Sequence, residues 1–149
     1  MENTSGKKIR NAIAPIGNRS SFITLIAMLA DCERWSKYKS DKLDMLFDVF
    51  AMVDSNVEWN NFGGFDFMLR DQSGYARVTY YEIDSPIPKI KRGDWVRIGA
   101  TMRPWGLQAT SIEITTPAAF LHGLREKMMD SRLALKRRLE EFGISETNL

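Results

Sequence analysis

The middle of the chain carries short hydrophobic runs separated by turn signals, which is the pattern of a β-rich domain. Residues 43–54 (LDMLFDVFAMVD) are almost wholly apolar or aromatic and predict a strand. Residues 65–83 (FDFMLRDQSGYARVTYYEI) predict a hairpin with its turn at Asp71–Gly74, and residues 91–114 predict a second hairpin with its tip at Pro104–Gly106. Several short strands with turns between them are typical of a sandwich or a barrel.

Helical spacing flanks this stretch on both sides. On the N-terminal side, Ser20 or Ser21 can cap a helix that ends near Arg34. The apolar positions of this helix are Phe22, Leu25, Ile26 and Leu29. On the C-terminal side, Thr116-Pro117 predicts the start of a long helix that Gly143 ends.

An apolar stripe runs along the predicted C-terminal helix. Its members are Leu121, Leu124, Met128, Leu135, Leu139 and Phe142. A long helix is marginal in water unless its apolar face is buried. We therefore expect the stripe to pack against partner helices; the alternative is that it folds back onto the chain's own barrel and N-terminal helix.

Alternation along the strands predicts which side chains reach the interior. In the second strand of the first hairpin, Val78 should be buried, whereas Arg77, Thr79 and Tyr81 should share the outward face. The first strand of the second hairpin should bury Val96, Ile98 and Ala100 and should expose Trp95, Arg97 and Arg103.

Five strands with a gap between the third and the fourth predict one kind of barrel. Asp84–Pro88 lies in that gap and holds two prolines, which cannot donate to a sheet ladder, so it should form a loop. The predicted fold class is mainly β: a five-stranded OB-fold barrel with an N-terminal helix and a long C-terminal helix. The domains would be a flexible arm at 1–19, the OB-fold with its leading helix at 20–116, an interaction helix at 117–143 and a tail at 144–149.

Composition and charge narrow the class of protein. The chain has 149 residues, which suits one domain with appendages, and no apolar run approaches the roughly 18 residues of a membrane helix. We expect neither a membrane segment nor a secretory leader, and the single cysteine, Cys32, indicates a reducing compartment. Residues 43–116 hold seven basic and ten acidic side chains, a net charge of −3, which argues against strong autonomous binding to a phosphate backbone.

Residues for catalysis or metal binding are sparse. The chain has one histidine, His122, and one cysteine, so neither a Cys/His metal set nor a Ser-His or Cys-His nucleophile is indicated. Gly63-Gly64 lacks the surrounding residues of a phosphate-binding loop. We therefore expect no enzyme, no metal and no cofactor.

Two segments carry a family resemblance. Residues 41–74 look like two strands around a polar loop and close on the turn Arg70-Asp71-Gln72-Ser73-Gly74, and residues 93–114 look like two strands around a tip with Arg103 and Trp105. Both segments resemble the middle subunit of replication protein A and its telomeric counterparts in the CST complex and in insect telomere-capping complexes. In that family the turn has a second Asp where this chain has Arg70. The family's tip carries an Arg and a DNA-stacking aromatic, which Arg103 and Trp105 match.

The resemblance implies a non-catalytic subunit of a single-stranded DNA-binding complex in the nucleus, on chromosomes or telomeres. The protein would be part of a hetero-oligomer, with a barrel that binds single-stranded DNA weakly alone and a C-terminal helix whose stripe binds other OB-fold subunits. The alternative is an OB-fold protein–protein scaffold that has lost nucleic-acid binding. RNA also stays open as a ligand, because base stacking does not sense the 2′-OH.

Candidate nucleic-acid residues lie in the hairpins and in the loop between the third and fourth strands. Aromatic side chains there can stack on bases, and arginines supply phosphate and cation–π contacts. The alternative roles are packing for the aromatics and a solvated surface of mixed charge for the basic residues. The candidates are Arg70, Arg77, Tyr81, Lys89, Lys91, Arg97, Arg103 and Trp105.

Overall fold

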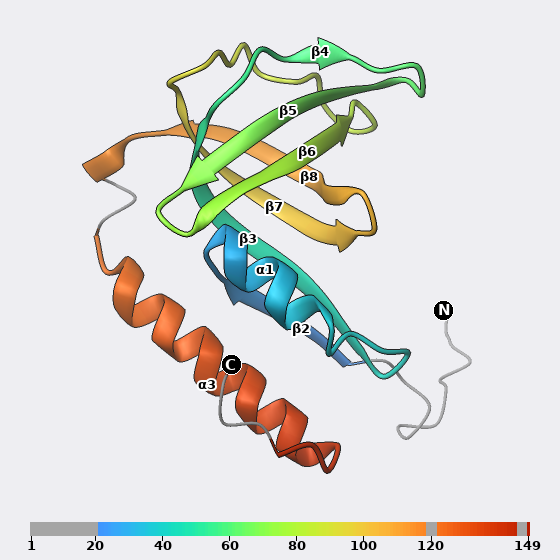
Figure 1. Ribbon diagram of the computed structural model, residues 1–149, viewed down its shortest axis with the longest axis vertical. Helices are drawn as coiled ribbons and strands as arrows, with labels where there is room; N and C mark the ends of the chain where they lie inside the picture. Colours follow the sequence, from blue (N-terminus) through green and yellow to red (C-terminus); the bar gives the residue numbers. More distant parts are fainter. Residues whose placement is uncertain (1–20, 119–121, 146–148) are drawn as a thin grey trace, which may run out of the picture.

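The computed structural model describes residues 21–118, 122–145 and 149, and five of its strands close into a barrel (Figure 1). These strands are β3 (Leu43–Val53), β5 (Gly64–Asp71), β6 (Gly74–Tyr81), β7 (Trp95–Arg103) and β8 (Gly106–Thr115). Around the barrel they run β3-β5-β6-β8-β7 and back to β3, antiparallel except for the parallel pair β6–β8. A five-stranded barrel of this kind is the OB-fold, so the predicted fold class is confirmed.

Strand β3 organises the barrel because it pairs with three neighbours. It runs antiparallel to β7, and its last two residues close the barrel by pairing Met52 with Arg70 and Val53 with Leu69 of β5. Its first half pairs in parallel with β2 (Ser21–Ile26), which lies outside the barrel. Every second side chain from Leu43 to Val53 is buried, so this strand supplies one wall of the core.

The connector from β3 to β5 and the region between β6 and β7 differ in structure. The former holds a short strand, β4 (Glu58–Trp59), which pairs with the start of β5. Residues 82–94 contain neither helix nor strand, as predicted for the proline-containing loop at Asp84–Pro88.

The N-terminal helix begins later than the sequence predicts. Residues Ser21–Ile26 form β2, and α1 (Leu29–Ser36) follows. Along β2 the side chains of Ile23 and Leu25 are buried, whereas Phe22 and Thr24 are exposed, which is the period of a strand. The apolar residues fit the helical period as well as the strand period, and pairing with β3 selects the strand. The predicted helix start at Ser20 or Ser21 is therefore wrong, and the predicted arm at 1–19 lies outside the described residues.

Helix α1 lies against the β5–β6 turn, which caps its first turn. The backbone N–H of Leu29 donates to Asp71 Oδ2 at 2.8 Å, and that of Ala30 donates to Ser73 Oγ at 2.9 Å. These side chains satisfy two of the N–H groups that a helix start leaves unpaired. On its inner side the helix buries Cys32 and Trp35, and burial raises the pKa of the Cys32 thiol.

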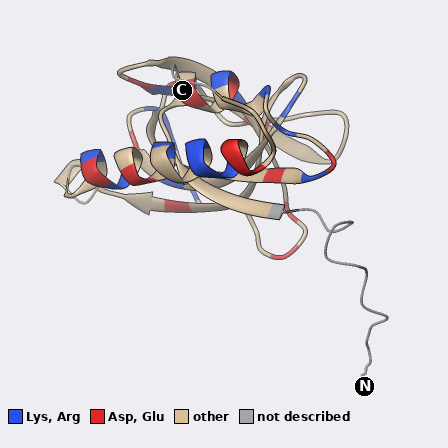
Figure 2. Ribbon diagram, turned by 90° about the horizontal axis from the view of Figure 1, so that it is seen from below, with Lys and Arg blue, Asp and Glu red and all other residues tan. Residues whose placement is uncertain are grey.

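Helix α3 (Leu124–Glu141) lies along β2 and carries acidic and basic residues along its length (Figure 2), most of which are exposed. It is shorter than predicted: residues 117 and 118 are helical, but α3 itself starts after Gly123, which has a φ of +67°. Gly143, with a φ of +79°, follows the helix as predicted. The backbone N–H of Ile26 in β2 donates to Ser131 Oγ at 2.9 Å, which joins helix and strand.

The predicted apolar stripe is largely buried within this chain. Leu124, Leu135 and Leu139 are buried, Met128 is half-buried and Phe142 is exposed, while Leu121 lies outside the described residues. The isolated chain therefore does not leave the whole stripe free for partner helices, and the alternative, that the helix folds back onto its own chain, holds for these three leucines. Strand β2, which the sequence did not reveal, extends the sheet and gives the helix a surface on which to fold back.

Candidate nucleic-acid interface

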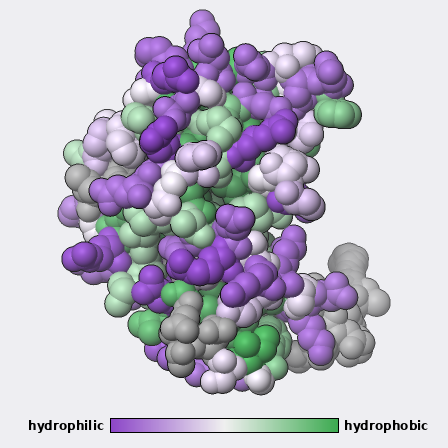
Figure 3. Space-filling model, viewed as in Figure 1, coloured by the Kyte–Doolittle hydropathy of each residue, from purple (hydrophilic) through white to green (hydrophobic). Residues whose placement is uncertain are grey.

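The outer face of the β5–β6 hairpin brings together several of the predicted residues. The register places Arg70 opposite Tyr75 and Arg77 opposite Met68. Val78 is fully buried, as predicted from alternation, whereas Thr79 is buried although it was expected to face outward. In the space-filling view of this side, hydrophobic side chains show at the centre of the face and hydrophilic ones surround them (Figure 3).

Both arginines on this face are paired with carboxylates. Arg70 Nη2 lies 2.8 Å from Asp54 Oδ2, and Arg77 Nη2 lies 2.6 Å from Asp66 Oδ2. A paired arginine adds little net charge to the surface around it. The strands of this face therefore offer a phosphate backbone less attraction than the number of arginines suggests.

Asp66 is the centre of a hydrogen-bond network that fixes one of these pairs. Thr79 Oγ1 donates to Asp66 Oδ1 at 2.6 Å, and Asn60 Nδ2 donates to the same oxygen at 3.0 Å. Partial burial raises the pKa of Asp66, but the hydrogen bonds from Thr79, Asn60 and Arg77 outweigh it and lower the pKa overall. Asp66 is thus ionised at neutral pH and ties β6 and the β3–β5 connector to β5.

The β7–β8 turn places Trp105 beside β6. Gly106 has a φ of +140°, and a Cβ atom there would lie 2.6 Å from the carbonyl oxygen of Arg77, so the close approach requires glycine. Trp105 is 40% exposed at the tip. Arg103 Nε donates to Gln108 Oε1 at 3.1 Å, and the described part of the chain records no carboxylate partner for Arg103.

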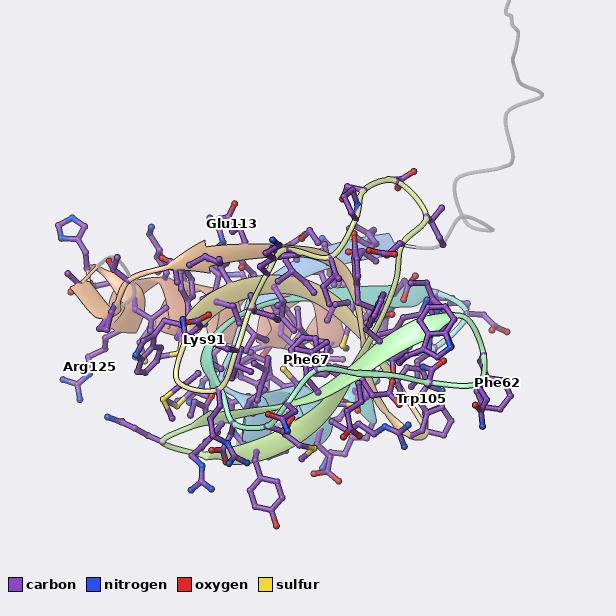
Figure 4. All side chains as sticks on the ribbon, turned by 90° about the horizontal axis from the view of Figure 1, so that it is seen from above. Phe62, Phe67, Lys91, Trp105, Glu113 and Arg125 are labelled. Carbon is purple, nitrogen blue, oxygen red and sulfur yellow. The ribbon has the colours of Figure 1, made fainter. Side chains whose placement is uncertain are left out.

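The β3–β5 connector contributes two aromatic side chains that were not among the residues predicted from the sequence. Trp59 is 63% exposed and packs edge-on against Phe65 at 5.2 Å between ring centroids, and Phe62 is 84% exposed. Asn60 Oδ1 accepts hydrogen bonds from the N–H groups of Phe62 and Gly64, which shapes the tip. Phe62 and Trp105 lie toward the same side of the barrel (Figure 4).

A signal for these residues was present in the sequence. The segment WNNFGG places two aromatics among polar residues and glycines, where no core is available to bury them. Tyr75, which is 70% exposed on β6, is a third aromatic of this face that was not selected.

Arg97 lies away from this group, on the outside of the β3–β7 pair. Its guanidinium donates to both carboxylate oxygens of Asp48, at 2.9 and 2.7 Å, and lies 5.4 Å from the centre of the Phe50 ring. The hydrogen bonds to Asp48 raise the pKa of Arg97, against a smaller lowering by partial burial. This arginine is thus held against the outer surface of the barrel by Asp48.

The remaining predicted residues are also separate from the Trp105 turn. Lys89 and Lys91 belong to the loop at 82–94, and Lys91 Nζ lies 3.3 Å from Asp94 Oδ1. Lys91 lies toward the opposite end of the barrel from Phe62 and Trp105 (Figure 4). Tyr81 ends β6 and is half-buried, with its ring packed over the position of Gly64.

Two features of the described residues bear on other functions. They contain no group of three or more His, Cys, Asp or Glu side chains that could hold a metal ion. None of the helices described is long and apolar enough to cross a membrane.

Solved structures of low sequence identity share the fold. A chain of a replication protein A heterotrimer bound to single-stranded DNA matches with a TM-score of 0.52 and 15% identity, over 63% of this chain and 75% of that chain. A chain of the crystal structure of yeast Stn1 and Ten1 matches with a TM-score of 0.54 and 12% identity, over 82% of both chains. The chain is thus an OB-fold that resembles components of these two complexes, as the sequence predicted.

Similarity in sequence is more limited. Human spermatogenesis-associated protein 22 is 27% identical to this chain over 75 residues. The match covers half of this chain and 21% of that protein, so the chain spans about a fifth of the relative's length. No family model matches the sequence.

Proposed function

We propose that this protein is a non-catalytic OB-fold subunit of a single-stranded DNA-binding complex, of the replication protein A or telomere end-protection kind, in the nucleus. The fold likeness to chains of a DNA-bound replication protein A heterotrimer and of Stn1–Ten1 supports this proposal. The observation that carries it is the set of exposed aromatics around the β5–β6 face: Trp59, Phe62, Tyr75 and Trp105.

Stacking is the interaction that this face favours. An aromatic side chain contributes about 1–3 kcal/mol for each base that stacks on it, whatever the base. Arg70 and Arg77 are paired with Asp54 and Asp66, so binding of a phosphate to the strands is less favourable than stacking of a base on the aromatics of the loops. Binding by the isolated protein should therefore be weak and tolerant of sequence.

The test is a titration of a labelled oligo-dT with the purified protein, followed by fluorescence anisotropy. Trp105→Ala and Phe62→Ala should each weaken binding by about 1–3 kcal/mol. Phe22→Ala is the matched control, since Phe22 is an exposed aromatic on β2, outside the barrel. If the wild-type protein does not bind at low salt, or if both loop variants bind as the control does, the proposal is wrong.

Assembly with other OB-fold subunits is the second part of the proposal. Because Leu124, Leu135 and Leu139 are buried, we assign contact with a partner to the exposed row of α3, where Met129 and Leu133 are 52% and 47% exposed. Leu133→Glu should remove OB-fold subunits that co-purify with the tagged protein from its native source, as identified by mass spectrometry. Lys127→Glu changes an exposed polar position on another face of the same helix and should retain them; equal recovery with both variants would contradict this assignment.

The protein–protein scaffold is the second candidate, and the paired arginines are the observation that favours it. A scaffold would retain its OB-fold partners while binding no single-stranded DNA at any salt concentration. The DNA titration and the co-purification experiment above therefore separate the candidates.

A further inference from the structure

A groove lies between α1, the start of β6 and the β7–β8 turn at one end of the barrel. It has a volume of about 610 Å³, within the range of about 300–1,000 Å³ that ligand pockets have. Its lining combines apolar, aromatic and polar side chains, among them Leu29, Glu33, Tyr75, Arg103 and Trp105. Trp105 therefore borders both the β5–β6 face and this groove.

A second hollow, of about 540 Å³, lies between the α1–β3 connector and the end of α3. Lys37, Lys39 and Lys42 line it together with Phe142. Lys39 lines the α1 groove as well, so the two hollows meet at this residue. The β4–β5 connector, the β7–β8 turn and the α1–β3 connector follow one another down the same side of the molecule (Figure 1).

These lysines are less engaged than the arginines of the β5–β6 face. Lys39 Nζ lies 3.6 Å from Asp44 Oδ1, a pair that solvent screens because both side chains are exposed. Lys37 Nζ lies over the Tyr38 ring at 5.1 Å. Among the described residues, neither Lys37 nor Lys42 has a carboxylate partner. Glu33 and Glu141 also line the hollows, so the lysines mark discrete positive points rather than a uniformly basic patch.

We infer that single-stranded DNA which crosses the β5–β6 face continues past Trp105 into the α1 groove, where Lys37 and Lys39 bind its phosphates. This inference rests on the proposed function and adds a second segment to the bound path. The groove takes the bases, and the lysines at its far end neutralise the backbone. Affinity should then rise with oligonucleotide length beyond what the β5–β6 face alone covers.

The experiment measures binding of oligo-dT ligands from about 4 to about 16 nucleotides, the range of OB-fold site sizes, at several salt concentrations. The Lys37→Gln/Lys39→Gln double variant removes the two proposed phosphate contacts. The matched control is Arg125→Gln/Lys127→Gln, which removes two exposed charges from the start of α3, and Arg125 lies at the opposite end from Trp105 (Figure 4). All four side chains are at the surface, so melting curves should match the wild-type curve.

Each phosphate contact to a single strand contributes about 0.7 to the slope of log K against log salt. The lysine variant should therefore lose about 1.4 from the slope on long ligands, which is about a tenfold loss of affinity near 0.15 M salt. On the shortest ligands it should bind as the wild type does. The control should keep the wild-type slope at every length.

Three outcomes would overturn the inference. The first is that the lysine variant keeps the full salt slope on long ligands, and the second is that it loses as much affinity for the shortest ligands as for the long ones. The third is that the control variant loses as much affinity as the lysine variant. In each case Trp105→Ala still tests the proposed function separately, because the β5–β6 face binds the short ligands. Absence of any binding by the wild-type protein would instead reject the proposed function itself.

Discussion

Leu135 decides whether α3 belongs to the core of this domain or is free for a partner. Its side chain is fully buried, whereas that of Leu133, two residues earlier on the same helix, is 47% exposed. Truncation of a buried leucine to alanine removes its transfer free energy and leaves a cavity, which together cost about 2–5 kcal/mol. Surface truncations usually change stability by no more than about 0.5 kcal/mol. Leu135→Ala should therefore destabilise the isolated chain strongly, and Leu133→Ala should leave it nearly unchanged.

Urea unfolding followed by circular dichroism measures the difference. With a slope of about 2 kcal/mol per molar urea, a loss of about 3 kcal/mol lowers the midpoint by about 1.5 M. The slope itself should not change, because the same surface is exposed on unfolding. Equal midpoints for both variants would show that α3 does not pack on β2 in solution. The stripe would then be available to partners, as first expected from the sequence.

Three other changes test the local structure. Gly106→Ala should displace the β7–β8 turn, because its Cβ would lie 2.6 Å from the carbonyl oxygen of Arg77; anisotropy should show weaker DNA binding, and the melting temperature should fall because alanine is strained at a φ of +140°. Asp71→Ala removes the side chain that caps Leu29 and should cost about 0.5–2 kcal/mol in urea unfolding, whereas a smaller loss would mean that the contact is not maintained. Because the pKa of Asp66 is lowered, its stabilising effect is present above the ordinary carboxyl pKa of about 3.9 and is lost as pH falls through the lowered value. Melting temperatures between pH 7 and 2 should therefore fall less steeply for Asp66→Asn than for the wild type; parallel curves would contradict this.

The barrel interior could be predicted because strand alternation is a local signal. Val78, Val96 and Ile98 were expected inside and are fully buried. Polar residues flank Val78 on both sides, and Arg97 lies between Val96 and Ile98, so only one face of each strand can enter the core. Turn residues such as Gly74 and Gly106 then define the ends of the hairpins.

The first strand could not be predicted, because its pattern fits two periods. Phe22, Leu25 and Ile26 follow helical spacing, whereas Ile23 and Leu25 follow strand spacing. Pairing with β3 decides between them, and that partner begins at Leu43, beyond α1. Since α3 packs on β2, the error at the N-terminus also led to the wrong expectation for the C-terminal stripe.

The sequence predicted some residues of the candidate site but not how the strand arginines are paired. Arg103 and Trp105 were selected from a local motif and do lie together at the β7–β8 turn. The neutralisation of Arg70 and Arg77 was not predictable, because their carboxylate partners lie 16 and 11 residues away in sequence. Such pairs depend on strand register and on the course of a connector, which composition does not reveal.

The paired arginines lead to a specific expectation about affinity. A phosphate that approaches Arg77 must compete with Asp66, whose ionised form is itself stabilised by Thr79 and Asn60. Exchange of one anion for another gains little free energy, so short ligands should show a shallow salt dependence and rely on stacking. Longer ligands reach the lysines of the α1–β3 connector, which are paired less closely with carboxylates than Arg77 is. If the proposed function is right, the contribution of charge to DNA binding should therefore increase with ligand length, and the α1–β3 connector should be its source.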